Sequence, residues 1–220
     1  MSAEQTYETQ RIDHLGIVAG ICHEISLIEQ IDKQVKVSER KVSCGKGTQA
    51  LILNALGFVG RALYLTPDYL SHKAVDLLIG PDVCAADFND DTLDRCLDDL
   101  YEAGVTEVFY KVATHALQVH GIQSQFVHLD ISSFHLHGAY DSQEPEREAI
   151  SITYGYSRDH RPDLKQVVVQ LITHHKSALP VWFEALSGNS NDKKTFTATL
   201  KAYTQISRRI KFANNFTPEG

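Results

Sequence analysis

The hydrophobic pattern of this chain changes once, just after Gly121, and this change limits the possible folds more than any other feature. Before it, apolar residues recur at helical spacing. After it, short runs rich in β-branched and apolar residues alternate with polar loops, and these runs are 126–131, 149–156, 165–173 and 179–186. The loop lengths suit an antiparallel meander, which 193–207 follows as a helix. We therefore predict an α+β protein with a helical domain at 1–122 and a sheet-containing domain at 123–220.

Several helix boundaries in the first domain follow from single residues. We expect one helix from Asp13 to Lys33, capped by Asp13, and a second over 47–61, where Gly57 would allow close packing. Thr66-Pro67-Asp68 indicates a short helical turn, because proline is tolerated at a first helical position. Asn89 would cap a helix that ends at Gly104, and 105–120 forms the last helix before Gly121.

Composition excludes several classes of protein. The net charge is −7 and the pI about 5.8, so the chain does not coat nucleic acid through bulk charge, and any DNA contact must be local. No apolar run reaches the length of a membrane-spanning helix and no signal core begins the chain, which predicts a cytoplasmic protein without a membrane partner. Four cysteines at irregular spacing favour reduced, structural thiols over disulfides or a zinc site.

Asp130 is the carboxylate most open to a catalytic interpretation. It lies near the end of a predicted buried strand, where an acid must be solvated, hydrogen-bonded or bound to a cation. The alternative is an acid that caps the following turn. His128, His135 and His137 suggest a metal site as well, but their alternation along the strand is imperfect and no acid or thiol completes a set of ligands, so hydrogen-bonded histidines are favoured.

Two polar loops are candidates for contact with phosphates. The loop that carries Arg158, His160 and Arg161 lies between two predicted strands, although Asp159 or Asp163 could instead bond the backbone and make the turn self-sufficient. Lys193 and Lys194 begin the last predicted helix, whose first amide groups can receive an anion, but a simple turn and cap is the alternative.

Taken together, three segments resemble the opening of the catalytic domain of DDE insertion-sequence transposases. They are Phe126 to Gly138 (FVHLDISSFHLHG), Tyr154 to Gln166 (YGYSRDHRPDLKQ) and Ala185 to Lys194 (ALSGNSNDKK). Upstream, LGIVAGICHEI from Leu15 and NDDTL from Asn89 are similar to the helical N-terminal domain that accompanies this group. The resemblance covers about Ile12 to Tyr203.

The resemblance implies an RNase H-like fold in which three carboxylates hold two divalent metals, Mg²⁺ or Mn²⁺, for cleavage and strand transfer at the ends of a mobile DNA element. It makes Asp130 the first carboxylate, and therefore both the catalytic and the metal-binding candidate. The second and third carboxylates would follow the helix 193–207, and Asp192, which precedes it, is not assigned. The stretch from Ser207 to Gly220 departs from the family's course, which suggests a truncated domain.

We therefore expect a fragment of a transposase that is catalytically incomplete alone, since a single aspartate binds magnesium poorly. By resemblance its partner is DNA. The alternative is a non-enzymatic DNA-binding or protein-interaction module that associates with itself or with an intact transposase.

Overall fold

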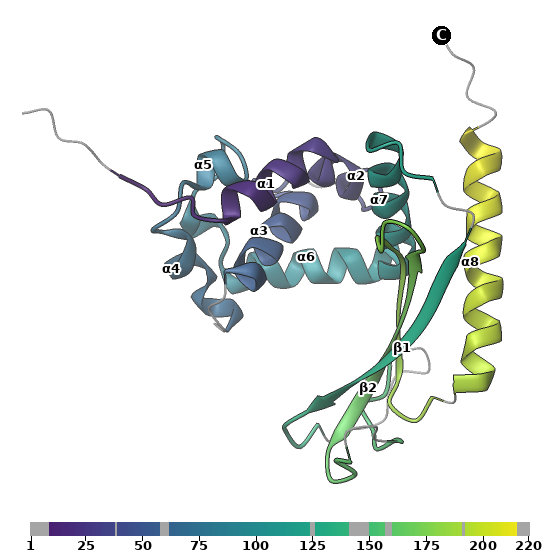
Figure 1. Cartoon of the computed structure of the whole chain (residues 1–220). Coiled ribbons are helices and arrows are strands. Elements are labelled where there is room, and N and C mark those ends of the chain that lie inside the picture. The colour runs from purple at the N-terminus through teal and green to yellow at the C-terminus, as the bar shows by residue number, and fades with distance from the viewer. Residues whose placement is uncertain are drawn as a thin grey trace, which may run out of the picture. The chain divides into compact units, whose positions relative to one another are not determined.

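A computed structural model describes residues 9–37, 39–57, 62–123, 126–140, 150–156, 160–190 and 192–214, without the side chains of 192–194 and 210–214. The chain divides into two compact units, Met1–His120 and Gly121–Gly220, each of which is considered by itself (Figure 1). Among the described residues, no helix combines the length and the apolar character needed to cross a membrane.

Unit 1 is helical. Its α-helices are α1 (Leu15–Glu24), α2 (Leu27–Asp32), α3 (Cys44–Leu56), α4 (Thr66–Leu70), α5 (Val75–Leu78), α6 (Asp90–Ala103) and α7 (Val105–Val119), with 3₁₀ turns at Leu63–Leu65 and Ala85–Asp87. The helix α3 is buried at Ala50 and Leu53, which join Leu15 and Phe88 in one apolar cluster. A second cluster brings Leu27 and Ile31 of α2 against Cys96 of α6.

The single helix predicted from Asp13 to Lys33 is wrong. The chain breaks between α1 and α2 at Ser26, which adopts a left-handed conformation with φ of 50°. The break redirects the chain, so that Leu15 of α1 packs into the first cluster while Leu27 and Ile31 pack into the second. Asp13 does not cap α1 either, because its carboxylate pairs with Lys73 at 2.7 Å.

The second helix was predicted over 47–61, but α3 begins three residues earlier, at Cys44, and ends at Leu56. The boundaries at Asn89 and Gly104 are confirmed. The side chain of Asn89 accepts a hydrogen bond from the amide of Thr92 at 2.9 Å, which caps α6. Gly104 ends α6 with φ of 83°, a conformation that favours glycine. The structure explains Gly57 as well, because a Cβ at this position would lie 2.0 Å from the hydroxyl of Tyr69 in α4.

Unit 2 contains one antiparallel sheet in the order β1-β2-β3, formed by β1 (Val127–Leu136), β2 (Lys165–His174) and β3 (Pro180–Ser187). The predicted meander is confirmed, but the described part of unit 2 has three strands instead of the predicted four. Residues 150–156 form no strand, and only Thr153 pairs with Gln166 of β2. The reason is that β3 already occupies that edge of β2 as far as the pair Val167 and Ser187.

The long helix α8 (Asp192–Asn214) covers one face of the sheet (Figure 1). This face carries Gln166, Val168, Gln170 and Ile172 of β2, all of them buried. The helix was predicted to end at Ser207 but continues to Asn214, because no proline or glycine interrupts it before Pro218. The contact includes an edge-to-face pair of Trp182 and Tyr203, with ring centroids 5.8 Å apart.

Candidate functional site

Three segments of unit 2 that are distant in sequence lie at the same end of the sheet. The register pairs Leu136 with Lys165, and Val167 with Ser187, so β1 and β3 end where β2 begins. The residues that flank these ends, 137–140, 150–156, 160–164 and 188–190, are called the loop end here. Because the sheet is antiparallel, all three stretches that resemble transposases reach this end.

Gln166, the second residue of β2, holds the loop end together. Its buried side-chain amide donates to the carbonyl of Gly188 at 2.8 Å and to that of Tyr156 at 3.4 Å. Its backbone exchanges two hydrogen bonds with Thr153, at 2.9 and 3.3 Å, and the amide of Gly188 donates to the carbonyl of Ser151 at 3.0 Å. These bonds join 150–156 and the turn after β3 to the start of β2.

Two glycines allow the backbones of the loop end to approach one another. A Cβ on Gly155 would lie 1.9 Å from the carbonyl oxygen of Gly188, and a Cβ on Gly188 would lie 2.1 Å from the carbonyl oxygen of Gln166. Both distances are far below van der Waals contact, and the clashing atoms belong to the backbone. The glycines in YGYS and LSGN are therefore required by packing between the two segments.

The cations described at the loop end already contact acceptors of the protein. Arg161 forms a two-point ion pair with Asp163, with N–O distances of 2.9 and 2.8 Å, and this contact lowers the pKa of the Asp163 carboxyl to about 2. Lys165 donates to the carbonyls of Ala139 and Tyr140, at 2.6 and 2.9 Å. Asp163 thus pairs with Arg161, and a backbone hydrogen bond at Asp163 also lowers the pKa of its carboxyl, which agrees with the self-sufficient turn considered from the sequence.

The structure describes the remaining phosphate-binding candidates in different detail. His160 is exposed at the loop end and has a left-handed backbone, with φ of 56°. Lys193 and Lys194 lie in the first turn of α8, directly after the loop end, although their side chains are not described. Arg158 lies outside the described residues.

Asp130 lies in the middle of β1 and not near its end, because the strand continues to Leu136. It pairs with Leu171, whereas its neighbour Ile131 pairs with the buried Gln170. Since strand side chains alternate, Asp130 lies on the face that α8 does not cover, and its side chain is exposed. Its Oδ1 accepts a hydrogen bond from the amide of Ile131 at 2.8 Å.

Asp130 is not surrounded by further metal ligands in the part of the chain that the structure describes. No group of three or more His, Cys, Asp or Glu side chains is arranged there to hold a metal ion. Glu184, the acid of β3, pairs with Gln170 and therefore lies on the opposite face from Asp130.

The three histidines considered from the sequence do not converge. His128 shares the uncovered face with Asp130, whereas His135 pairs with Gln166 and lies on the face covered by α8. His128 instead contacts His175, which sequence reasoning missed, with 2.5 Å between Nε2 and Nδ1. His175 follows β2 and reaches β1 through the hydrogen bond of its amide to the carbonyl of Phe126, at 3.1 Å.

A polar network under α8 was also not predicted. The amide of Gln170 lies between the hydroxyls of Thr195, at 2.9 Å, and Thr199. Thr199 donates to Glu184 at 2.7 Å, and Glu184 also accepts from the indole of Trp182 at 3.3 Å. The sequence offered one signal for this network, because Gln166 and Gln170 lie on the same face of a strand that is otherwise mostly apolar.

Comparison with known proteins informs only unit 1. The profile of a family described as "Domain of unknown function (DUF4277)" matches residues 7–114, which lie within unit 1. No curated protein and no solved structure matches the chain.

Proposed function

We propose that this chain is part of a DNA transposase of the DDE class and that unit 2 contacts DNA through its loop end. The sheet and α8 would be the first three strands and the first helix of an RNase H-like domain. Two features of the architecture support this. The strands form a meander followed by a helix on one face, and β1 lies at an edge of the sheet, where a further strand could pair.

The observation that carries the proposal is the convergence of the three resembling segments. FVHLDISSFHLHG, YGYSRDHRPDLKQ and ALSGNSNDKK are separated in sequence, yet Gln166, Tyr156 and Gly188 join the last two directly, and β1 ends beside them. Segments that form one surface are expected to serve one function. The resemblance is therefore supported by a spatial cluster and not by sequence order alone.

The distribution of charge favours unit 2 as the part that contacts DNA. Residues 1–120 contain ten Lys and Arg against eighteen Asp and Glu, a net charge of −8, whereas residues 121–220 contain eleven against ten, a net charge of +1. The negatively charged backbone of DNA is repelled by the net charge of the first segment but not by that of the second. We assign the phosphate contacts to Arg158, His160, Arg161, Lys193 and Lys194.

Arg161 would have to exchange its partner on binding. A phosphate offers the same two-point geometry as the carboxylate of Asp163, so the guanidinium can bind either group. Because the ion pair with Asp163 is lost in the exchange, the contact of Arg161 with phosphate adds little to the free energy of binding. The lysines at the start of α8 are therefore expected to contribute more of the salt-dependent affinity.

We further propose that these 220 residues do not cleave DNA alone. Intact relatives would use Mg²⁺ or Mn²⁺ held by three carboxylates. The described residues around Asp130 do not fit such a two-metal centre, because they include no group of three or more potential metal ligands. Hard cations need several oxygen ligands, so one aspartate holds them weakly. Asp130 is retained as the candidate first carboxylate.

A band-shift assay with salt titration tests the loop end. Duplex DNA that carries the end of the encoding element is compared with unrelated duplex, using the full chain and the double variant Lys193→Ala/Lys194→Ala. We expect weaker binding and a salt dependence of log K that is lower by about two. The matched control Lys176→Ala/Lys201→Ala removes the same charge from exposed positions away from the loop end.

Equal losses in the two double variants would contradict a loop-end site and indicate bulk attraction instead. Absence of binding by the full chain would refute the DNA contact altogether. Cleavage of the same duplex in Mg²⁺ or Mn²⁺ that disappears in Asp130→Ala would refute the proposed inactivity of the chain.

Unit 1 favours a second function, as a protein-interaction module. Its acidic balance argues against DNA, while α6 exposes Leu97 (43%) and Tyr101 (63%) beside Asp94 and Asp98. A protein partner would bury these apolar side chains. Gel filtration of the chain alone, and together with a full-length related transposase, measures self-association and pairing, and elution as a monomer in both experiments contradicts this function.

A further inference from the structure

Two buried thiols of unit 1 lie against each other between α3 and α6. Cys44, at the start of α3, is 4% exposed, and Cys96, in the middle of α6, is fully buried. The sulfur of Cys44 lies 3.5 Å from the carbonyl oxygen of Cys96, and the sulfur of Cys96 lies 3.9 Å from the carbonyl oxygen of Ser43. Each sulfur therefore contacts the backbone of the other helix at or next to its partner cysteine.

Gly47 makes room for this arrangement. It lies one turn after Cys44 in α3, and a Cβ at this position would lie 2.3 Å from the sulfur of Cys96. Without a side chain at Gly47, α6 approaches α3 closely enough for the sulfur of Cys96 to lie beside the turn that begins with Cys44. Close approach of two helices is the condition that a disulfide between them requires.

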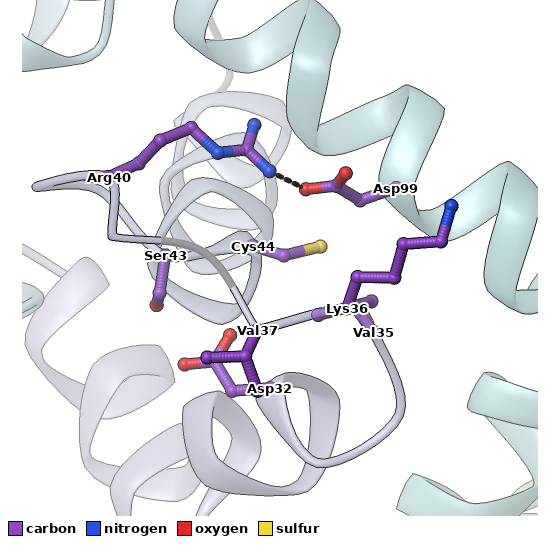
Figure 2. A pocket seen from close by; sticks show the side chains of 8 residues that line it. All are labelled: Asp32, Val35, Lys36, Val37, Arg40, Ser43, Cys44 and Asp99. Carbon is purple, nitrogen blue, oxygen red and sulfur yellow. Dashed lines mark hydrogen bonds and ion pairs between the residues drawn. The ribbon is translucent and has the colours of Figure 1, made fainter.

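A small molecule can reach the pair from the side of Cys44. Cys44 lines a cavity of about 190 Å³, together with Asp32, Lys36, Arg40 and Asp99. Figure 2 shows the sulfur of Cys44 directed into the space bounded by Asp99 and Lys36, with the ion pair of Arg40 and Asp99 beside it. The volume is several times the roughly 30 Å³ that a water molecule occupies in the liquid, so a hydroperoxide fits.

The surroundings also shift the pKa values of the two thiols in opposite directions. The hydrogen bond from the Cys44 thiol, followed by the charge of Arg40, lowers the pKa of Cys96 against the opposing effect of burial. The same hydrogen bond, together with burial, raises the pKa of Cys44. Cys96 is therefore the more acidic thiol of the pair, and a thiolate is the reactive form of cysteine.

We propose that Cys44 and Cys96 are a redox site at which a hydroperoxide forms a reversible disulfide between α3 and α6. The inference rests on unit 1 alone and does not depend on the proposed DNA contact. It assigns a chemical role to two residues that would otherwise be structural thiols in an apolar cluster.

The reaction balances with hydrogen peroxide as the oxidant. The sulfur of Cys44, which lines the cavity, attacks one peroxide oxygen, an S–O bond forms, the O–O bond breaks, and the hydroxide leaves as water with the proton of the Cys44 thiol. The sulfur of Cys96 then attacks the oxidised sulfur, the S–S bond forms, and a second water leaves. The two sulfurs lose two electrons in total, and the peroxide gains them.

The test uses the full chain with Cys84→Ser, which removes the exposed cysteine. The chain is treated with hydrogen peroxide, quenched, unfolded and alkylated, and then examined by intact mass and peptide mapping. We expect loss of two hydrogen masses, a peptide that links Cys44 to Cys96, and reversal by dithiothreitol. The thermal midpoint of unit 1 should rise by about 5 °C or more, since the bond closes a long loop.

Full alkylation of Cys44 and Cys96 after peroxide treatment would overturn the proposal, and so would sulfinic or sulfonic acid at Cys44 without a cross-link. Cys44→Ser should abolish both the linked peptide and the rise in midpoint, whereas Cys22→Ser, which removes another buried thiol, should preserve both. The peptide map needs no change at either reacting cysteine, so the result stands even if Cys44→Ser fails to fold.

Discussion

Gly188 occupies a position in which a side chain would meet backbone atoms on two sides. Its Cβ would lie 2.1 Å from the carbonyl oxygen of Gln166 and 2.5 Å from that of Thr153. We expect Gly188→Ala to destabilise unit 2 by about 2 kcal/mol or more, because neither backbone can move without losing the hydrogen bonds that join them. Urea denaturation followed by the fluorescence of Trp182, the only tryptophan, measures this loss.

Asn189→Ala provides the matched control, since it introduces the same side chain at the exposed neighbouring position and should change stability by no more than about 0.5 kcal/mol. Equal stability of the two variants would mean that the loop end rearranges freely, which would weaken the argument that it is one surface.

The ion pair of Arg161 and Asp163 predicts a dependence on pH. Arg161 lowers the pKa of Asp163 from its ordinary value of 3.8 to about 2. A carboxyl whose pKa is lower in the folded state stabilises that state above pH 3.8, and this contribution is lost as the pH falls from 3.8 toward 2. Because both side chains are exposed, the energy is small, and NMR titration of the Asp163 carboxyl is the appropriate measurement.

The titration midpoint should lie near 2 in the unchanged chain and move up toward 3.8 in Arg161→Gln. The same resonance should respond to added DNA if Arg161 exchanges Asp163 for a phosphate. A midpoint that does not move in Arg161→Gln would show that the pair is absent in solution.

Contact between α8 and the sheet joins the two layers of unit 2, and its centre is polar. Thr199→Val keeps the size of the side chain but removes the hydroxyl that bonds to Glu184. We expect a loss of about 1 to 3 kcal/mol, since the buried side-chain oxygen of Gln170, to which the same hydroxyl donates, then lacks this donor. Thr199→Ser keeps the hydroxyl and should cost less, and Trp182 fluorescence during urea denaturation compares the two variants. The opposite order would show that packing of the methyl group outweighs the hydrogen bond.

The strands were predictable to different degrees for physical reasons. In β2 and β3, β-branched and apolar residues are dense, and the predicted limits lie within one residue of those observed. The second half of β1 was missed because Ser132, Ser133 and His135 carry little strand preference of their own. The run 149–156 has strand composition, but β3 takes the edge of β2 that it would need, and that competition is not visible locally.

The candidate site was predictable only where it depends on local sequence. The side of the sheet on which Asp130 lies follows from the register, which the sequence does not specify. Gathering of the resembling segments at one end follows from an antiparallel meander, which was predicted. The roles of Gln166 and Gly188 depend on contacts between distant segments, and no local pattern marks them.

At the scale of the molecule, the two units are expected to unfold independently. Phe88 is fully buried in the first apolar cluster of unit 1, so Phe88→Ala should cost about 3 to 5 kcal/mol there. The helical signal in far-ultraviolet circular dichroism should then fall at a lower urea concentration. The transition of Trp182, which lies in unit 2, should stay unchanged. A joint shift of both transitions would show that the units fold as one cooperative body.

The polar centre beneath α8 also determines where along its length the helix can rest. Thr195, Thr199 and Tyr203 follow one another at intervals of four residues and face the sheet, so displacement by one turn would exchange one for the next. A purely apolar seam would tolerate such a slip. Here a slip in one direction would bring the phenol ring of Tyr203 to the place of Thr199 and remove the Thr199 hydroxyl from Glu184 and Gln170. The network therefore fixes the register of α8 on the sheet and keeps the basic first turn of this helix beside the loop end.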